Sequence, residues 1–202
     1  QGCCGALAWH TGDLRAARGF ARRLIDAFPA DVDAIVTNAT GCGSALHEYP
    51  LVLRGTADEA RARAFRERVE DASVFLTRLG VRTPFRQTPL RVVYQDACHL
   101  AHAQGVAAAP RALLRAVPGI ELVELADPHL CCGSAGTYNL DQPEIAASLG
   151  EAKARAIVAA APDVVASGNI GCLTQLRLHL DRLGAAIPAR HTMAVLRDAL
   201  AP

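Results

Sequence analysis

Two adjacent cysteines constrain this chain more than any other feature of its sequence. Cys131 and Cys132 are followed at once by small residues, which extend through Gly136. Neighbouring Cα atoms lie about 3.8 Å apart, below the lower limit of about 4.4 Å for an ordinary disulfide. Two neighbouring thiolates also repel each other unless a cation takes up their charge. The pair therefore indicates a metal site, with two buried and unreactive cysteines as the simpler alternative.

A second copy of this motif near the start of the chain favours the metal site. Cys3 and Cys4 form a pair that is again followed by a glycine. Each pair is followed, at a similar distance along the chain, by one further cysteine, which is Cys42 or Cys172. Two isolated buried pairs would not be expected to share this order and spacing, so the repetition indicates a common chemical purpose.

The chain as a whole reads as an internal repeat. The segments 33–42 and 163–172 align without a gap, and the cysteine motifs occur in the same order in both halves. We therefore expect two cysteine-rich repeats, a first one over 1–85 and a second one over 86–202. Because the chain opens at Gln1 inside a motif, we expect it to be a C-terminal fragment with an N-terminally truncated first repeat.

Composition limits the class of protein. Apolar residues make up 51% of the 202 residues, which is enough for a core, and Lys plus Arg total 21 against 20 for Asp plus Glu. This balance predicts no nucleic-acid partner. No apolar run reaches the length of about 18 residues that spans a membrane. Seven cysteines without a secretory leader indicate metal or redox chemistry in a cytoplasmic protein, which could still dock on the inner face of a membrane.

Short β-branched runs alternate with helical patterns along the chain. Strands are expected at 32–37, 90–94, 120–125, 163–167 and 187–191. Helices are expected at 14–28, from about 44, at 57–79, 110–117, 141–161, 173–183 and 192–201. The alternation predicts an α/β fold of two Rossmann-like modules with mostly parallel sheets. For the helix after residue 140, Asp141 is expected to be the N-cap.

Four cysteines are expected to meet at one edge of the second sheet. Cys98, Cys131, Cys132 and Cys172 each follow a predicted strand, and the carboxyl ends of parallel strands lie along one edge. Four thiolates suit either a structural zinc ion or an iron-sulfur cluster. Zinc sites usually take their ligands from short C-x-x-C turns, so the wide spacing favours a cluster.

The first half carries an incomplete version of the site. Cys3, Cys4 and Cys42 correspond to three of the four cysteines in the second half, and no residue corresponds to Cys98. By the same repeat, the missing cysteine is expected about 33 positions upstream of Cys3, in a part of the parent chain that precedes this fragment.

Other polar residues are weaker candidates. His99 and His102 could bind metal or donate a hydrogen bond to a cluster sulfur, with a polar loop position as the alternative. Asp96 with Glu124 or Glu144 could imitate a pair of catalytic carboxylates, but solvated or capping roles are simpler. The remaining histidines are expected at the surface or at helix caps: His10, His47, His129, His179 and His191.

Four stretches of the chain together resemble a known family. They are 1–7, 38–43, 94–100 and 130–139. They are similar to the CCG cysteine-rich domain, which is found twice in one component of heterodisulfide reductase and in the iron-sulfur subunits of several flavin dehydrogenases. The resemblance is strongest to the glycolate oxidase iron-sulfur subunits, and it covers essentially the whole chain.

The resemblance implies a cofactor and partners. It implies a [4Fe-4S] cluster at Cys98, Cys131, Cys132 and Cys172, and a second, incomplete site at Cys3, Cys4 and Cys42. It also implies an upstream ferredoxin-like region, and partner subunits that carry FAD and oxidise glycolate or another 2-hydroxy acid. Electrons would then pass through this chain toward the quinone pool. Since the chain has no flavin-binding stretch, it would have no catalytic residues of its own.

One departure from the family pattern matters. The fuller family motif ends in C-x-x-C, whereas Ala39 and Asn169 occupy the first cysteine position of that motif here. Disulfide reduction at a noncubane cluster, as in heterodisulfide reductase, is therefore in doubt. Two alternatives stay open at this point, a heterodisulfide-reductase-like thiol/disulfide redox subunit and a zinc-stabilised interaction domain.

Overall fold

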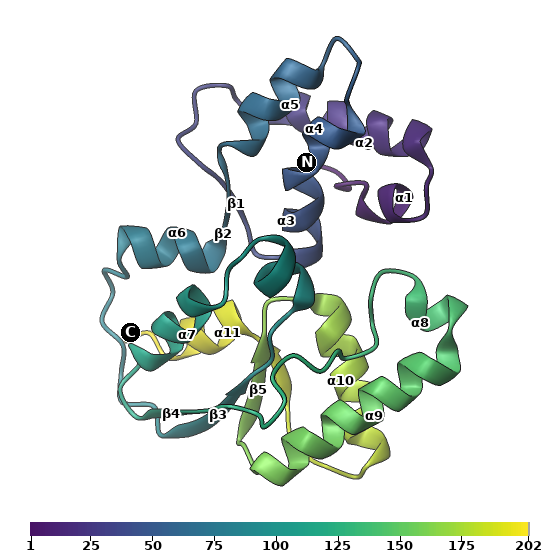
Figure 1. Ribbon diagram of the computed structural model, residues 1–202. Coiled ribbons are helices and arrows are strands. Elements are labelled where there is room, and N and C mark those ends of the chain that lie inside the picture. Colours follow the sequence, from purple (N-terminus) through teal and green to yellow (C-terminus); the bar gives the residue numbers. More distant parts are fainter. Residues whose placement is uncertain (202) are drawn as a thin grey trace. The chain divides into compact units, whose positions relative to one another are not determined.

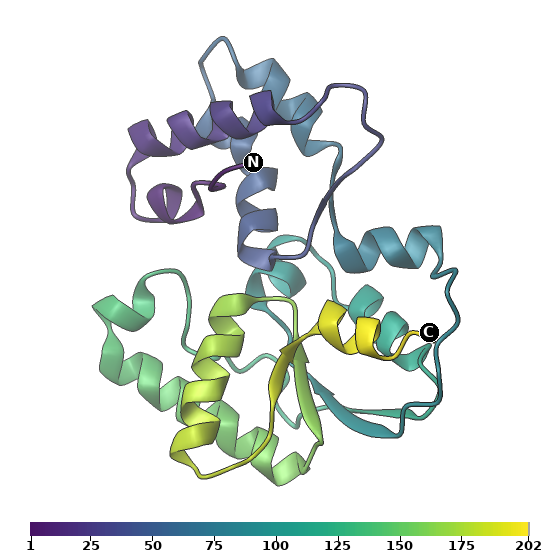
Figure 2. The same ribbon diagram turned by 180° about the vertical axis from the view of Figure 1, so that it is seen from behind.

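The structure is a computed structural model, and it describes residues 1–201. The chain divides into two compact units, the first from Gln1 to Phe75 and the second from Leu76 onward. Both units combine helices with parallel strands (Figures 1 and 2), so the expected α/β class is confirmed. Among the described helices, none combines the length and the apolar character needed to cross a bilayer.

The first unit packs helices against a two-stranded parallel sheet. Its elements are α1 (Ala6–His10), α2 (Leu14–Ala27), β1 (Ile35–Thr37), α3 (Thr40–His47), α4 (Tyr49–Val52), α5 (Glu59–Arg66) and β2 (Val69–Asp71), and α6 (Ala72–Leu79) begins at its end. In the sheet, Ile35 of β1 pairs with Val69 of β2. The expected helix at 14–28 is confirmed as α2. Asp13 caps this helix, since its side chain accepts a hydrogen bond from the backbone N of Ala16 at 2.9 Å.

The long helix expected at 57–79 is wrong. Helix α5 ends at Arg66, and β2 follows it and pairs with β1 before α6 begins. Val69 and Asp71 are buried, and Asp71 Oδ1 accepts a hydrogen bond from the backbone N of Ser73 at 2.8 Å. Strand pairing and burial therefore override a local pattern of Arg and Glu that favours a helix. The partner strand β1 is also shorter than expected, and its Val36 is 45% exposed.

The second unit is a three-layer α/β structure. Its elements are β3 (Leu90–Tyr94), the π-helical turn η1 (His99–Ala103), α7 (Ala108–Arg115), β4 (Ile120–Val123), α8 (Tyr138–Asp141), α9 (Pro143–Ala160), β5 (Val164–Ser167), α10 (Ile170–Arg182), β6 (Ala189–His191) and α11 (Thr192–Asp198). The four strands are parallel in the order β4-β3-β5-β6.

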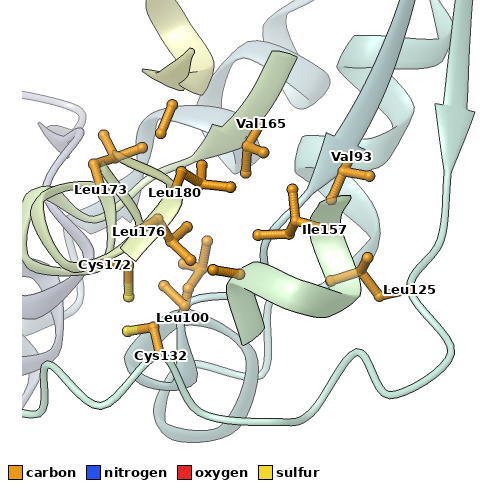
Figure 3. Packing of buried hydrophobic residues seen from close by; sticks show 13 residues of the cluster. Val93, Leu100, Leu125, Cys132, Ile157, Val165, Cys172, Leu173, Leu176 and Leu180 are labelled. Atoms are coloured by element: carbon orange, nitrogen blue, oxygen red, sulfur yellow. The ribbon is translucent and has the colours of Figure 1, made fainter. Parts of the chain in front are cut away.

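Alternation along the central strands separates two cores. Val93 and Val165 belong to a core with residues of α9 and α10, which Figure 3 shows from close by. Their neighbours Val92 and Val164 belong to a second core with residues of α7 and α11. Side chains of a strand alternate between its faces, so each central strand is buried on both sides. This arrangement fixes the carboxyl ends of β3, β4 and β5 beside one another.

Several helix starts differ from the expected ones. Asp141 does not cap α9, because it lies at the end of α8, where it accepts a hydrogen bond from the hydroxyl of Thr137 at 2.7 Å. Gln142 is the residue before α9, and Pro143 is its first residue. Helices α3 and α10 begin at Thr40 and Ile170, earlier than expected.

Candidate metal centre

The four cysteines predicted in the second half line one pocket at the carboxyl edge of the sheet. Cys98 immediately precedes η1, in the segment that follows β3, and Cys131 and Cys132 lie in the long loop after β4. Cys172 lies in the first turn of α10, which follows β5. All four side chains contribute to the lining of the same pocket. The topology of the sheet thus brings together residues from three separate strand ends.

The four thiols are close enough to influence one another's ionisation. The thiols of Cys131 and Cys172 each shift the pKa of Cys132. Figure 3 shows the sulfurs of Cys132 and Cys172 side by side at the end of the core, and both residues are buried. Cys98 and Cys131 are partly exposed and complete the lining of the pocket.

The electrostatics of these thiols indicate that they need a cation. Hydrogen bonding to Cys132 and burial raise the pKa of the Cys131 thiol. Cys131 lowers the pKa of Cys132, but the hydrogen bond to Cys172 and burial raise it to about 12. Burial and the charge of Cys131 raise the pKa of Cys98. Deprotonating the set together therefore requires positive charge between the sulfurs, which an iron-sulfur core would supply.

A single metal ion and a cluster place different demands on the positions of their donors. Within residues 1–201, no group of three or more Cys, His, Asp or Glu side chains is spaced to hold one metal ion. A tetrahedral zinc needs all its sulfurs about 2.3 Å from one point. A cluster binds its cysteines through different irons, so its sulfurs surround a larger space.

Local backbone chemistry shapes the two loops that carry three of these cysteines. Gly133 has φ +83°, and a Cβ at this position would overlap the backbone oxygen of Ala146 in α9. Its backbone N donates a hydrogen bond to the sulfur of Cys131 at 3.3 Å. Asn169 caps α10, because its Oδ1 accepts a hydrogen bond from the backbone N of Gly171 at 3.0 Å. The residue that stands in place of a family cysteine therefore has a structural role here.

Two histidines share the pocket with the cysteines. The rings of His102 and His129 lie 5.6 Å apart between centroids, and both residues line the pocket and are exposed. His99 Nδ1 lies 3.9 Å from the sulfur of Cys98. The pairing of His129 with His102 was missed from the sequence, because the two residues lie on different loops and no spacing rule joins them.

The carboxylates considered as a catalytic pair are held by one arginine. Arg111 binds both oxygens of Asp96 at 2.8 and 2.6 Å and both oxygens of Glu124 at 2.8 and 2.9 Å. The expectation of a solvated or capping role is therefore wrong for Asp96, whose side chain is buried, whereas Glu124 is exposed, as expected, while it pairs with Arg111. Arg111 lowers the pKa of Glu124, and both carboxylates raise the pKa of Arg111. This bidentate network ties α7 to the segments after β3 and β4.

The three cysteines of the first unit also lie near one another. The thiol of Cys4 donates a hydrogen bond to the sulfur of Cys42 at 3.0 Å, and the backbone N of Gly5 donates to the sulfur of Cys3 at 3.4 Å. The hydrogen bond from Cys4 lowers the pKa of Cys42 to about 7 and raises the pKa of Cys4. The hydroxyl of Tyr49 donates to the backbone oxygen of Cys4 at 2.8 Å and fixes this segment.

The remaining histidines divide between caps, surface and core. His191 caps α11, because its Nδ1 accepts a hydrogen bond from the backbone N of Met193 at 3.1 Å. His10 is exposed in the last turn of α1. His179 is buried in α10 beside Gln175, so its expected surface or capping position is wrong. Burial lowers the pKa of His179.

Comparison with known proteins agrees with this arrangement. A family model described as the CCG "Cysteine-rich domain" matches residues 1–47 and 92–177, which contain all seven cysteines. The chain is 37% identical over 205 residues to the probable glycolate oxidase iron-sulfur subunit of Bacillus subtilis, covering 98% of this chain and 46% of that protein.

Two further relatives come from Escherichia coli and Geobacillus kaustophilus. The glycolate oxidase iron-sulfur subunit of Escherichia coli is 34% identical over 211 residues, which cover 98% of this chain and 49% of that protein. The lactate utilization protein A of Geobacillus kaustophilus is 32% identical over 198 residues, which cover 97% of this chain and 82% of that protein. The chain thus spans about half the length of the glycolate oxidase subunits that it matches. The chain belongs to the CCG cysteine-rich domain family.

Proposed function

We propose that this chain is the cluster-binding part of an iron-sulfur subunit in an oxidoreductase complex that oxidises a 2-hydroxy acid. The observation that carries the proposal is that Cys98, Cys131, Cys132 and Cys172 line one pocket. The names of the relatives support the class of complex, since they include iron-sulfur subunits of glycolate oxidase and a lactate utilization protein. Glycolate and lactate are both 2-hydroxy acids, so the substrate class is common to both names.

The four cysteines would hold a [4Fe-4S] cluster, which supplies one-electron transfer when it is bound. Cys132 and Cys172 are buried, so they would hold the side of the cluster that faces the core. Cys98 and Cys131 would hold the more accessible side, from which electrons can leave toward a partner. The backbone N–H of Gly133 would donate to the sulfur of Cys131, and such hydrogen bonds raise the potential of a cluster.

Cys3, Cys4 and Cys42 would form part of a second cluster site. The contact between Cys4 and Cys42 supports this role, and a cysteine upstream of Cys3 would complete the site. The repeat organisation over 1–85 and 86–202 belongs to the same proposal, because each repeat would then bind one cluster.

Substrate oxidation would take place on partner subunits. Asp96 and Glu124 are both engaged by Arg111, so neither serves as a free catalytic base. Partner subunits that carry FAD would oxidise the hydroxy acid, and an upstream ferredoxin-like region would pass electrons on. The final acceptor would be the quinone pool, with the complex at the cytoplasmic face of the membrane.

The proposal is tested by metal and sulfide analysis together with EPR of anaerobically purified protein before and after dithionite. We expect iron and acid-labile sulfide, and a paramagnetic signal after reduction. Cys132→Ser should remove one cluster's share of the iron. Cys42→Ser is the matched control, since it changes the other site and should leave the second-unit signal in place. Zinc without iron, or an unchanged signal in Cys132→Ser, would refute the proposal.

A further inference from the structure

One lysine occurs in the whole chain, and it is buried. Every other basic residue counted among the 21 is an arginine, whereas Lys153 is 0% exposed. It lies in α9, which packs on α10 and on the core below the cysteines. Buried ammonium groups are costly unless they are paired or hydrogen-bonded, so this position needs a physical reason.

The partners of Lys153 belong to the turn that leads into the cysteine pair. Its Nζ donates to the backbone oxygens of Asp127 and Pro128, both at 3.2 Å. The carboxylate of Asp127 accepts from the backbone N of Leu130 at 3.1 Å, and Pro128 and Leu130 line the cysteine pocket. Lys153 therefore holds the polypeptide immediately before Cys131.

The charge of Lys153 has no ion-pair partner in the described residues. No carboxylate among residues 1–201 forms an ion pair with it, and its hydrogen-bond partners are both carbonyl groups. Burial lowers the pKa of this amine overall, and the charges of Asp127, Asp96, Cys132 and Cys131 offset part of that effect. The sulfurs of the pocket are thus among the anionic groups that favour its protonated form.

We infer that Lys153 is a positioning residue that compensates the negative charge of the cluster and holds the turn before its central ligands. This inference rests on the proposed cluster at Cys98, Cys131, Cys132 and Cys172. Four thiolates around an iron-sulfur core leave net negative charge, which increases on reduction. A fixed positive charge nearby stabilises the reduced state more than the oxidised state, so Lys153 raises the reduction potential.

Lysine and arginine differ in the size and shape of the cation that they would bury here. A lysine ammonium is a compact point charge on a flexible stem, and its donors can reach two adjacent carbonyls. An arginine guanidinium is a planar fork that suits carboxylates, as Arg111 shows with Asp96. Arg68 also donates to two adjacent carbonyls, those of Pro29 and Ala30, but at an exposed position, whereas Lys153 is fully buried, where the smaller cation is easier to enclose.

Two substitutions separate the charge from the hydrogen bonds. Lys153→Met removes both, and Lys153→Gln removes the charge while keeping an N–H donor. Arg155→Gln is the matched control, since it removes one positive charge from the same helix at a position where the side chain is 66% exposed. All variants are purified anaerobically with the cluster bound, and the midpoint potential is measured by EPR during a redox titration.

Both Lys153 variants should favour the oxidised cluster about tenfold, which for a one-electron couple is a midpoint lowered by about 59 mV. Arg155→Gln should shift it far less, because water screens an exposed charge. The inference would be overturned if the potential is unchanged in both Lys153 variants, or if it shifts in Lys153→Met alone. It would also be overturned if both variants keep their fold but lose the cluster. A wild-type protein without a cluster signal would instead overturn the proposed function.

Discussion

Replacing Gly133 with alanine should destabilise the second unit through a steric conflict at the cysteine loop. Gly133 has φ +83°, and a Cβ built there would overlap the backbone oxygen of Ala146 and lie 3.0 Å from its carbonyl carbon. The obstacle is helix backbone in α9, which cannot rotate away as a side chain could. The loop would have to move, and Cys132 would move with it.

The magnitude has two parts that a control can separate. A left-handed backbone costs alanine about 1–2 kcal/mol, and overpacking against fixed atoms adds about 1–3 kcal/mol. We therefore expect Gly133→Ala to lower the free energy of unfolding by about 2–5 kcal/mol, a large fraction of the usual total. Gly184→Ala tests the first part alone, since Gly184 has φ +66° and open space around its Cβ position.

The assay is urea unfolding followed by circular dichroism, with iron content measured on the same preparations. Gly133→Ala should have a lower transition midpoint than Gly184→Ala and should retain less iron. If the two variants have equal midpoints and equal iron content, the close packing of the cysteine loop on α9 does not constrain the site as described.

Three further predictions concern single side chains. Arg111→Met should lower the free energy of unfolding by about 3–5 kcal/mol, measured by urea unfolding, because it leaves the carboxylate of Asp96 buried without its partner. Adding Asp96→Asn to this variant should restore part of the lost stability, and a double variant as unstable as Arg111→Met would contradict this explanation. Burial lowers the pKa of His179, so below about pH 6.5 the unfolded chain binds a proton that the folded chain does not. The free energy of unfolding should therefore decrease as the pH is lowered below about 6.5, by up to about 1.4 kcal/mol per pH unit. His179→Gln should remove this contribution from unfolding curves recorded between about pH 7 and about pH 5, and an unchanged slope would contradict it. Phe65→Ala should lower the stability of the first unit by about 3–5 kcal/mol, because Phe65 is fully buried, and native-state hydrogen exchange should show no loss of protection in the second unit's sheet.

The second unit was predictable because its strands are locally distinctive. The strand expected at 90–94 is confirmed as β3, and its valines are buried on both faces, as its sequence suggests. In the parallel sheet, the carboxyl ends of β3, β4 and β5 lie at one edge. The cysteines follow these strands in the sequence, so they reach the same edge. For this reason a shared pocket for four distant cysteines could be expected from the sequence alone.

The failures arise where long-range contacts decide the structure. Val69 joins a strand only because Ile35 lies beside it, and the Arg and Glu residues around it fit a helix equally well. The ammonium of Lys153 and the bridge from Arg111 to Glu124 depend on how helices pack against loops. Hydrophobic periodicity predicts which face of a helix is buried, but it does not predict which polar atoms that face contacts. These contacts could therefore not be predicted from the sequence.

The central claim is that Cys98, Cys131, Cys132 and Cys172 bind one iron-sulfur cluster. The most direct measurement is an anomalous difference map, recorded at the iron absorption edge from crystals grown under anaerobic conditions. The claim predicts a compact peak within bonding distance of all four sulfurs. The claim would be contradicted by an iron peak that lies beyond bonding distance of any one of these four sulfurs. A peak that appears only at the zinc edge would also contradict it.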